Sequence, residues 1–223
     1  MGLLEGKKAL VMGVGNKRSI AWGIATAFQR EGADLAFNWP NERLKDNVLE
    51  LVATLPNHES IPVGPCDVSK QDEIDKFFAE MDRKWGRLDI LVHSIAFAAI
   101  EDLKSVMSLT YNAVDRVVPS YNSMAMAKAV LEAETRYLAA DLGPHNVRVN
   151  AISAGPLKTL AGSAVRGISQ ARDLMVEKAP LRRNITQDEV GNVAVFLASE
   201  WSRAVTGATI FADNGFNIIG VTE

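Results

Sequence analysis

"KKALVMGVGNKRSIAWGIATAFQREG" occupies residues 7–32 and decides the fold prediction. Its apolar start, 7–13, predicts a short buried strand, and the helical periodicity of 19–32 predicts a helix that ends on a glycine. Between them, Gly13 and Gly15 allow the backbone to approach a ligand closely. Ser19, at the start of the helix, could cap it or bind a phosphate. A Gly-x-Gly turn alone also fits an ordinary strand-to-helix connection.

Beyond this unit, short apolar runs continue to alternate with amphipathic ones. We expect further strands at 34–39, 60–68, 88–97, 105–111, 147–153 and 207–215, and further helices at 41–55, 70–86, 121–143 and 186–199. Nearly continuous apolar strands that alternate with helices indicate a parallel sheet covered on both faces. The sequence therefore predicts a single α/β domain with a doubly wound parallel sheet, the Rossmann fold.

Composition narrows the class of protein. The chain has 223 residues, a net charge of −3 and no cluster of Lys and Arg, which argues against a nucleic-acid surface. No apolar run approaches the ~18 residues of a membrane span, and the N-terminus does not resemble a signal peptide. Cys66 is the only cysteine, so an internal disulfide is excluded. The three histidines show no metal-ligand spacing. We expect a cytoplasmic protein without a metal.

In a doubly wound sheet, ligands bind at the carboxyl ends of the strands. The second strand ends at Asn38-Trp39 without an acidic residue, and Arg43 could meet a 2′-phosphate, although it also reads as a solvated charge. Asp67, after the third strand, could accept a hydrogen bond from adenine or cap its own turn. We expect His93, near the end of the fourth strand, to be a core histidine with its polar atoms satisfied.

Two of the three tyrosines stand near one lysine: Tyr111, Tyr121 and Lys128. Residues seven apart on a helix share a face, so Tyr121 and Lys128 are expected to point into one volume. A neighbouring ammonium lowers the pKa of a phenol, which would make Tyr121 a better hydrogen-bond or proton donor. A surface tyrosine and an unrelated lysine would give the same spacing.

The Tyr-x6-Lys spacing, with a tyrosine ten residues upstream, resembles the bacterial NADH-dependent enoyl-acyl-carrier-protein reductases of the short-chain dehydrogenase/reductase superfamily. Further matches cover nearly the whole chain, among them "HSIAFA" (93–98), "RVVPSYNSMAMAKA" (116–129), "VRVNAISAGPLKTLA" (147–161) and "DEVGNVAVFLAS" (188–199).

The resemblance implies that NADH, with NADPH as the alternative, reduces the trans-2 double bond of an enoyl thioester on acyl carrier protein. Tyr121 would donate a hydrogen bond to the thioester oxygen, Lys128 would hold the nicotinamide ribose, and Tyr111 would position the substrate. It further implies a homotetramer. We assign Tyr137, further along the same helix, a packing role.

By the same resemblance, the cofactor contacts are Gly13, Ser19, Ile20, Asp67, Val68, Ser94, Ile95, Ala96, Lys128, Pro156, Leu157 and Thr159. The acyl pocket would be lined by Ala96, Phe97, Tyr111, Tyr121 and Met124, with Met126 either in the pocket or in the core. Residues 158–177 match the substrate-covering lid, and a plain surface helix is the alternative.

The resemblance breaks between 98 and 105. Parallel neighbours need a crossover of a dozen or more residues, usually a helix, and only seven residues separate Phe97 from Ser105. The crossover helix of the family is missing here. We hypothesise that the printed sequence omits residues that the protein contains.

Two rival functions remain open. A short-chain ketone or alcohol reductase would use Ser108, Tyr121 and Lys128, although its Tyr–Lys spacing is shorter. A non-catalytic NAD-binding paralogue is the other, and it gains weight only if the crossover is truly absent.

Overall fold

The computed structural model describes residues 2–93, 104–118, 121–159 and 167–220. Within them a seven-stranded, entirely parallel sheet runs in the order β3-β2-β1-β4-β5-β6-β7. Its strands are β1 (Lys8–Met12), β2 (Asp34–Trp39), β3 (Val63–Pro65), β4 (Ile90–His93), β5 (Ser105–Thr110), β6 (Arg148–Ala154) and β7 (Thr209–Ala212). The doubly wound single domain predicted from the sequence is confirmed.

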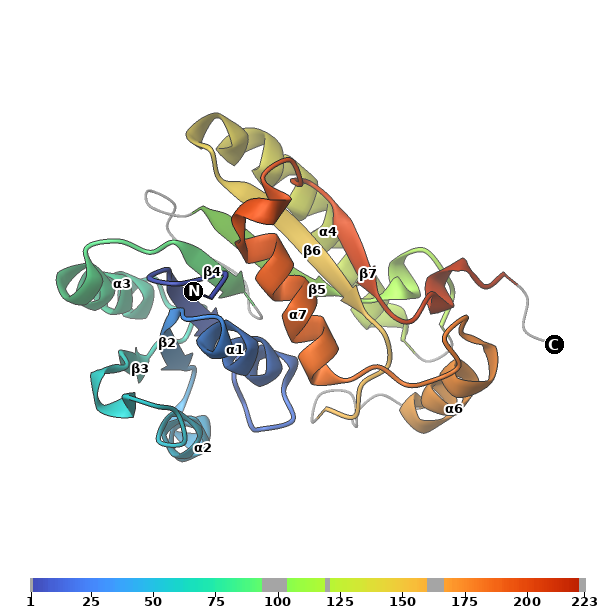
Figure 1. Cartoon of the computed structure of the whole chain (residues 1–223), viewed down its shortest axis with the longest axis horizontal. Helices are drawn as coiled ribbons and strands as arrows, with labels where there is room; N and C mark the ends of the chain where they lie inside the picture. Colours follow the sequence, from blue (N-terminus) through green and yellow to red (C-terminus); the bar gives the residue numbers. More distant parts are fainter. Residues whose placement is uncertain (1, 94–103, 119–120, 160–166, 221–223) are drawn as a thin grey trace.

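Helices cover both faces of this sheet, with α1 and α7 in front and α4 behind in Figure 1. The helices are α1 (Ile20–Arg30), α2 (Glu42–Val52), α3 (Gln71–Trp85), α4 (Asn122–Leu142), α6 (Ile168–Lys178) and α7 (Gln187–Ala198). Each expected helix is present to within a few residues at either end. None of the helices described is long and apolar enough to cross a membrane.

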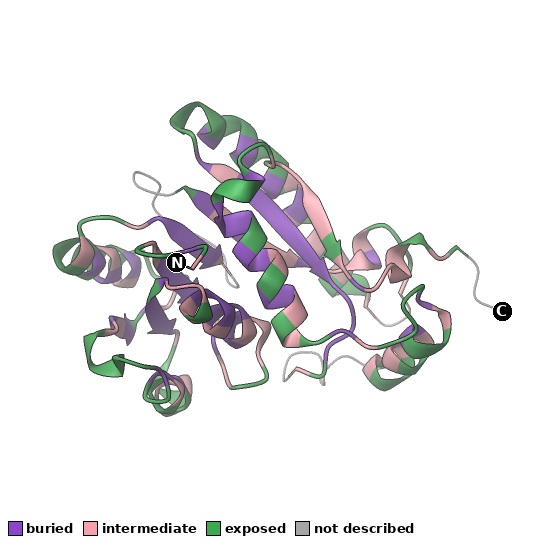
Figure 2. Cartoon of the chain, viewed as in Figure 1, coloured by how far each residue is buried: buried purple, intermediate pink, exposed green. Residues whose placement is uncertain are grey.

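Two apolar cores lie on opposite sides of the sheet, and Figure 2 shows the buried strands between them. The larger core joins α1, α2 and α7 to the sheet through side chains such as Phe28, Phe37 and Leu197. The smaller core lies under α3 and α4 and includes Phe77, Leu91 and Leu142. Burial of apolar surface at this scale is the main force that holds the layers together.

Glycines allow α1 and α7 to touch. A Cβ added at Gly191 would lie 2.8 Å from the carbonyl oxygen of Gly23 and 2.9 Å from Cβ of Ala27. Thr186 and Glu189 start α7 with a capping box, in which each side chain accepts from the other residue's backbone N–H. Together these contacts hold α7 against α1.

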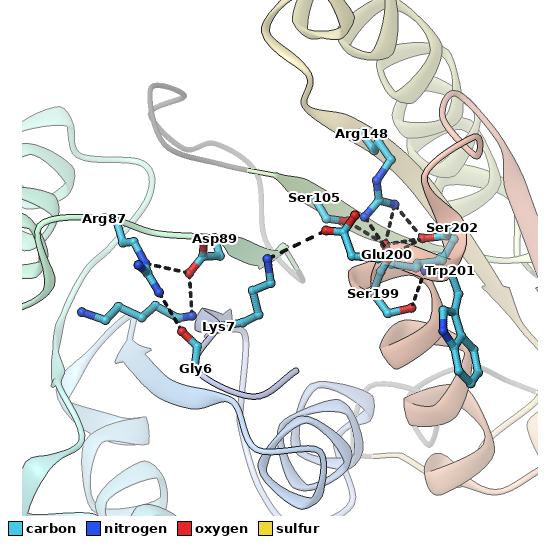
Figure 3. A network of polar contacts seen from close by, with 12 residues as sticks. Gly6, Lys7, Arg87, Asp89, Ser105, Arg148, Ser199, Glu200, Trp201 and Ser202 are labelled. Carbon is cyan, nitrogen blue, oxygen red and sulfur yellow. Dashed lines mark hydrogen bonds and ion pairs between the residues drawn. The ribbon is translucent and has the colours of Figure 1, made fainter. Parts of the chain in front are cut away.

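Polar contacts secure the amino ends of the strands, the edge away from the predicted site (Figure 3). Arg148 donates to the Leu197 carbonyl (2.6 Å) and to Ser202 Oγ (2.8 Å), and Ser105 Oγ donates to the same carbonyl (3.0 Å). The backbone N–H of Lys104 donates to the Asp89 carbonyl (2.8 Å), which aligns the starts of β4 and β5. These contacts join residues from both halves of the chain at the amino edge of the sheet.

Candidate active site

The first strand-to-helix turn combines a glycine in the left-handed region with a capped helix start. Gly13 has φ +90°, a conformation that side chains with a Cβ rarely adopt. Ser19 Oγ accepts from the backbone N–H of Trp22 (3.2 Å) and donates to the Asn16 carbonyl (2.8 Å), so its capping role is confirmed. Ile20 is the first residue of α1, where backbone N–H groups and the helix dipole favour an anion.

At the ends of β2 and β3, some polar groups have hydrogen-bond partners and others have none among the described residues. Asn38 Nδ2 donates to the Cys66 carbonyl (2.9 Å), while Asn38 Oδ1 and Trp39 Nε1 are buried without partners in the part of the chain described. Asp67 accepts from the backbone N–H and the hydroxyl of Ser69 (3.0 and 2.7 Å), and these bonds lower the pKa of its carboxyl. Of its two possible roles, the Asp67 side chain takes the turn-capping one here.

At the end of β4, His93 is partly buried between the neighbouring strands, in register with Met12 and Ser108. Its Nε2 has no hydrogen-bond partner within the described residues, so the expectation of a satisfied core histidine is wrong. Burial lowers the pKa of His93 to about 4, which keeps the ring neutral at pH 7. The predicted cofactor and pocket residues Ser94, Ile95, Ala96 and Phe97 lie outside the described residues.

Tyr111 and Tyr121 meet where β5 ends and α4 begins. Tyr111 follows the last residue of β5, Tyr121 immediately precedes α4, and their rings meet edge-to-face with centroids 5.1 Å apart. Burial raises the pKa of both phenols, and for Tyr111 the charges of Tyr121 and Asp213 raise it further. Both phenols therefore keep their protons at neutral pH and can act as hydrogen-bond donors.

Lys128 lies two turns further along α4, and its Nζ donates to the Leu109 carbonyl at 2.7 Å. Burial lowers the pKa of this ammonium. The expectation that Lys128 lowers the pKa of Tyr121 is wrong, because desolvation by burial raises the pKa of this phenol. The lysine is held at the end of β5, with a backbone oxygen as its partner.

Polar side chains that sequence reasoning missed continue down the same face of α4. Thr110 Oγ1 donates to Glu132 Oε1 at 2.6 Å, and Ser108 Oγ lies 3.3 Å from Thr135 Oγ1. Glu132 is only 8% exposed and Thr135 only 3%. The spacing of residues 128, 132 and 135 places these polar side chains on one helix face, which could have indicated the contact. Such a polar face usually points to solvent, so the pattern was not interpreted as part of the site.

The turn after β6 supplies the remaining predicted cofactor residues. Pro156 and Leu157 are buried there, and Thr159 is partly buried. The lid prediction falls partly on 160–166, outside the described residues, while the rest forms α6 with Met175 as its only buried residue. A Cβ at Gly155 would come 2.5 Å from Met175 Cε, so this glycine makes room for the anchor of α6.

The outer face of α4 carries exposed apolar side chains. Tyr137 is 75% exposed in this single chain, so it does not pack within this subunit. Met126 is 66% exposed and Met124 also faces outward, so neither fills the core of this subunit. Helix α4 turns its polar stripe toward the sheet and an apolar surface outward.

A cavity of about 410 Å³ among the described residues is lined by neither Tyr121 nor Lys128. It is at the outer strand β7 and is lined by Leu181, Ile185, Val193, Phe211, Asp213 and Ile218, among others. The chemistry-bearing side chains thus sit at the carboxyl edge of the sheet, where a doubly wound fold binds its ligand, and not in this cavity.

Comparison with known proteins places this arrangement in a family. The family profile "Enoyl-(Acyl carrier protein) reductase" matches residues 13–104 and 99–217. The NADH-dependent enoyl-[acyl-carrier-protein] reductase of Bacillus cereus is 42% identical, with 99% of this chain and 100% of that protein aligned. The Aquifex aeolicus enzyme of the same name is 40% identical over 99% of this chain and 95% of its own length.

Solved structures agree with the sequence comparison. The Bacillus cereus enoyl-acyl carrier protein reductase, crystallised with NADP+ and an indole naphthyridinone, superposes with a TM-score of 0.93 at 41% identity and covers 99% of this chain and 100% of its own. The Anaplasma phagocytophilum enzyme in complex with NAD gives 0.89 at 35% identity and covers 100% of this chain and 98% of its own. The chain therefore belongs to the enoyl-(acyl carrier protein) reductase family.

Proposed function

We propose that this chain reduces the trans-2 double bond of enoyl thioesters carried on acyl carrier protein, the last step of each fatty acid elongation cycle. The observation that carries the proposal is the meeting of Tyr111 and Tyr121 at the carboxyl edge of the sheet, with Lys128 fixed beside the end of β5. Relatives that are named for this activity align over the full length of the chain.

The residues at the carboxyl edge fit a dinucleotide. The positive φ of Gly13 and the capped start of α1 suit a pyrophosphate. Asn38 Oδ1, Trp39 Nε1 and His93 Nε2, all buried without partners in the described residues, lie at the ends of β2 and β4, along which such a cofactor would extend. NADH, when bound, supplies the hydride that saturates the double bond. Asp67 and Val68 would flank its adenine, and Lys128, Pro156, Leu157 and Thr159 its nicotinamide end.

In this proposal Tyr121 donates a hydrogen bond to the thioester carbonyl oxygen as that oxygen gains negative charge. Its raised pKa keeps the proton on the phenol at neutral pH, which a hydrogen-bond donor requires. Tyr111, packed edge-on against it, positions the thioester. Lys128 holds the ribose with the donors that its bond to Leu109 leaves over.

The remaining parts of the proposal concern the surroundings of the site. Helix α6 would act as the lid over the acyl chain, with Met124 lining the pocket below it. The outward apolar residues of α4, Met126, Val130, Tyr137 and Leu138 among them, support a homotetramer in which that face is covered. We also propose a cytoplasmic location, where acyl carrier protein thioesters are made.

The proposal also includes the missing crossover helix between β4 and β5. Eleven residues, 94–104, separate β4 from β5, which nonetheless pair in parallel along Ile90–His93 and Ser105–Ser108. The Bacillus cereus alignment runs over 257 positions, so at least 34 of them have no counterpart in this chain. The family match is also split at 99–104. These observations support a deletion of the crossover helix from the printed sequence.

The test is NADH oxidation with crotonyl and acetoacetyl thioesters. Oxidation with the crotonyl thioester alone supports the proposal, since only a carbon–carbon double-bond reductase consumes it. Oxidation with acetoacetyl thioester alone would favour a ketone reductase. Quenching of tryptophan fluorescence by NADH without turnover of either thioester would indicate a non-catalytic binding protein.

A further inference from the structure

The buried pair Thr110–Glu132 has no role in the site described so far. Glu132 is 8% exposed and Thr110 5% exposed, and their hydrogen bond measures 2.6 Å. Among the described residues no lysine or arginine lies within 4 Å of the Glu132 carboxylate. A carboxylate buried against one hydroxyl is costly, and an apolar side chain would pack there at less cost. Because stability alone does not account for this pair, we looked for a function in its position.

Its position suggests one. Thr110 is the last residue of β5, and Tyr111 leaves the sheet directly after it to meet the ring of Tyr121. One residue earlier, the Leu109 carbonyl accepts from Lys128. Helix α4 thus bonds the last two residues of β5, at the point where the backbone turns toward the site. The short Thr110–Glu132 hydrogen bond therefore fixes the geometry of the strand end at this point.

We propose that Glu132 is a positioning residue which, through Thr110, sets the direction in which Tyr111 enters the acyl pocket. The side-chain hydrogen bond printed for this pair among the described residues involves neither Tyr121 nor Lys128, so its loss changes how well the thioester is placed and leaves NADH binding intact. This inference rests on the proposed function of the site.

The experiment compares two hydroxyl deletions in the same strand. Thr110→Val removes the donor beside Tyr111, and Ser105→Ala removes a buried hydroxyl at the other end of β5, where Arg148 and Ser202 still satisfy the Leu197 carbonyl (Figure 3). Thr110→Val leaves the buried Glu132 acceptor without its partner, so it should raise KM for crotonyl thioester about tenfold. KM for NADH should stay within about twofold of wild type for both variants, and Ser105→Ala should leave the thioester KM unchanged.

Conservative variants separate geometry from general destabilisation. Thr110→Ser retains the hydroxyl and Glu132→Gln retains an acceptor oxygen, so both should stay within about threefold of the wild-type KM. The double variant Thr110→Val/Glu132→Ala should be no worse than the more affected single variant, because both remove one interaction. Thermal melts and NADH titration of every variant confirm folding.

An unchanged thioester KM in Thr110→Val, or an equal rise in Ser105→Ala, would overturn the inference. A Glu132→Gln variant as impaired as Glu132→Ala would also overturn it, since the charge and not the bond would then matter. Failure of the wild-type enzyme to oxidise NADH with crotonyl thioester is a different result, which refutes the proposed function itself.

Discussion

Acid should destabilise this protein through one partly buried histidine, His93. Burial lowers the pKa of His93 to about 4, whereas an exposed histidine titrates near 6.5. As the pH falls below 6.5, His93 becomes protonated in the unfolded chain but stays neutral in the folded chain. The free energy of unfolding therefore decreases. The loss continues until the pH reaches the folded pKa, near 4, below which both states are protonated.

The size of the effect follows from the two pKa values. Between pH 7.0 and 4.5, linkage with 6.5 for the unfolded state and about 4 for the folded state gives a loss of about 2 kcal/mol from this residue. His93 has no hydrogen-bond partner on Nε2 in the described residues that would stabilise the charged ring. Replacing it with glutamine, which does not titrate, removes this contribution.

Urea unfolding of wild type and His93→Gln at pH 7.0 and 4.5 provides the assay. Carboxyl groups with lowered pKa values, such as Glu189 at about 2, also respond to acid, but they are common to both proteins and cancel in the comparison. We expect wild type to lose about 2 kcal/mol more than the variant over this pH range. Equal losses in the two proteins would show that His93 is not buried in its neutral form, and would refute the reasoning.

Two further predictions concern packing and chain length. Gly191→Ala should reduce the free energy of unfolding by about 1–3 kcal/mol, because its Cβ would meet α1 at 2.8 Å, while Gly143→Ala, with no atom within 4 Å, should cost nothing in the same urea melts. Similar losses in the two would contradict the tight α1–α7 contact. Intact mass spectrometry of the natural protein should give a mass above the 24.2 kDa of the printed sequence, because a crossover helix is expected between 98 and 105. A mass of 24.2 kDa would instead establish the short connection.

The fold followed from the sequence because strands such as β1 and β4 are apolar along most of their length and helices such as α1 and α3 carry a clear start or stop. Ser19 caps α1, and Gly86 ends α3 with φ +65°, both as local chemistry dictates. The third strand was predicted at 60–68 but pairs only over Val63–Pro65, at the edge of the sheet. Edge strands receive fewer tertiary contacts, so sequence patterns locate their ends less well.

The site was predictable in part. Spacing placed Lys128 on a helix that begins next to Tyr121, but it could not tell that burial, and not a neighbouring charge, raises the pKa of the phenol. Glu132 escaped notice because a charged residue in a helix normally faces solvent, and only the tertiary structure shows its bond to Thr110. Tyr137 shows the converse, because an aromatic residue in a helix need not be covered within one subunit.

The central claim is that the Tyr121 phenol donates a hydrogen bond to the oxygen that gains charge as the double bond is reduced. Steady-state NADH oxidation with crotonyl thioester by wild type and Tyr121→Phe tests it most directly, since phenylalanine keeps the ring and its edge contact with Tyr111 but removes the donor. Loss of one such donor should lower kcat by about 10²–10³ with little change in KM for NADH. A variant that turns over at the wild-type rate would remove Tyr121 from the mechanism.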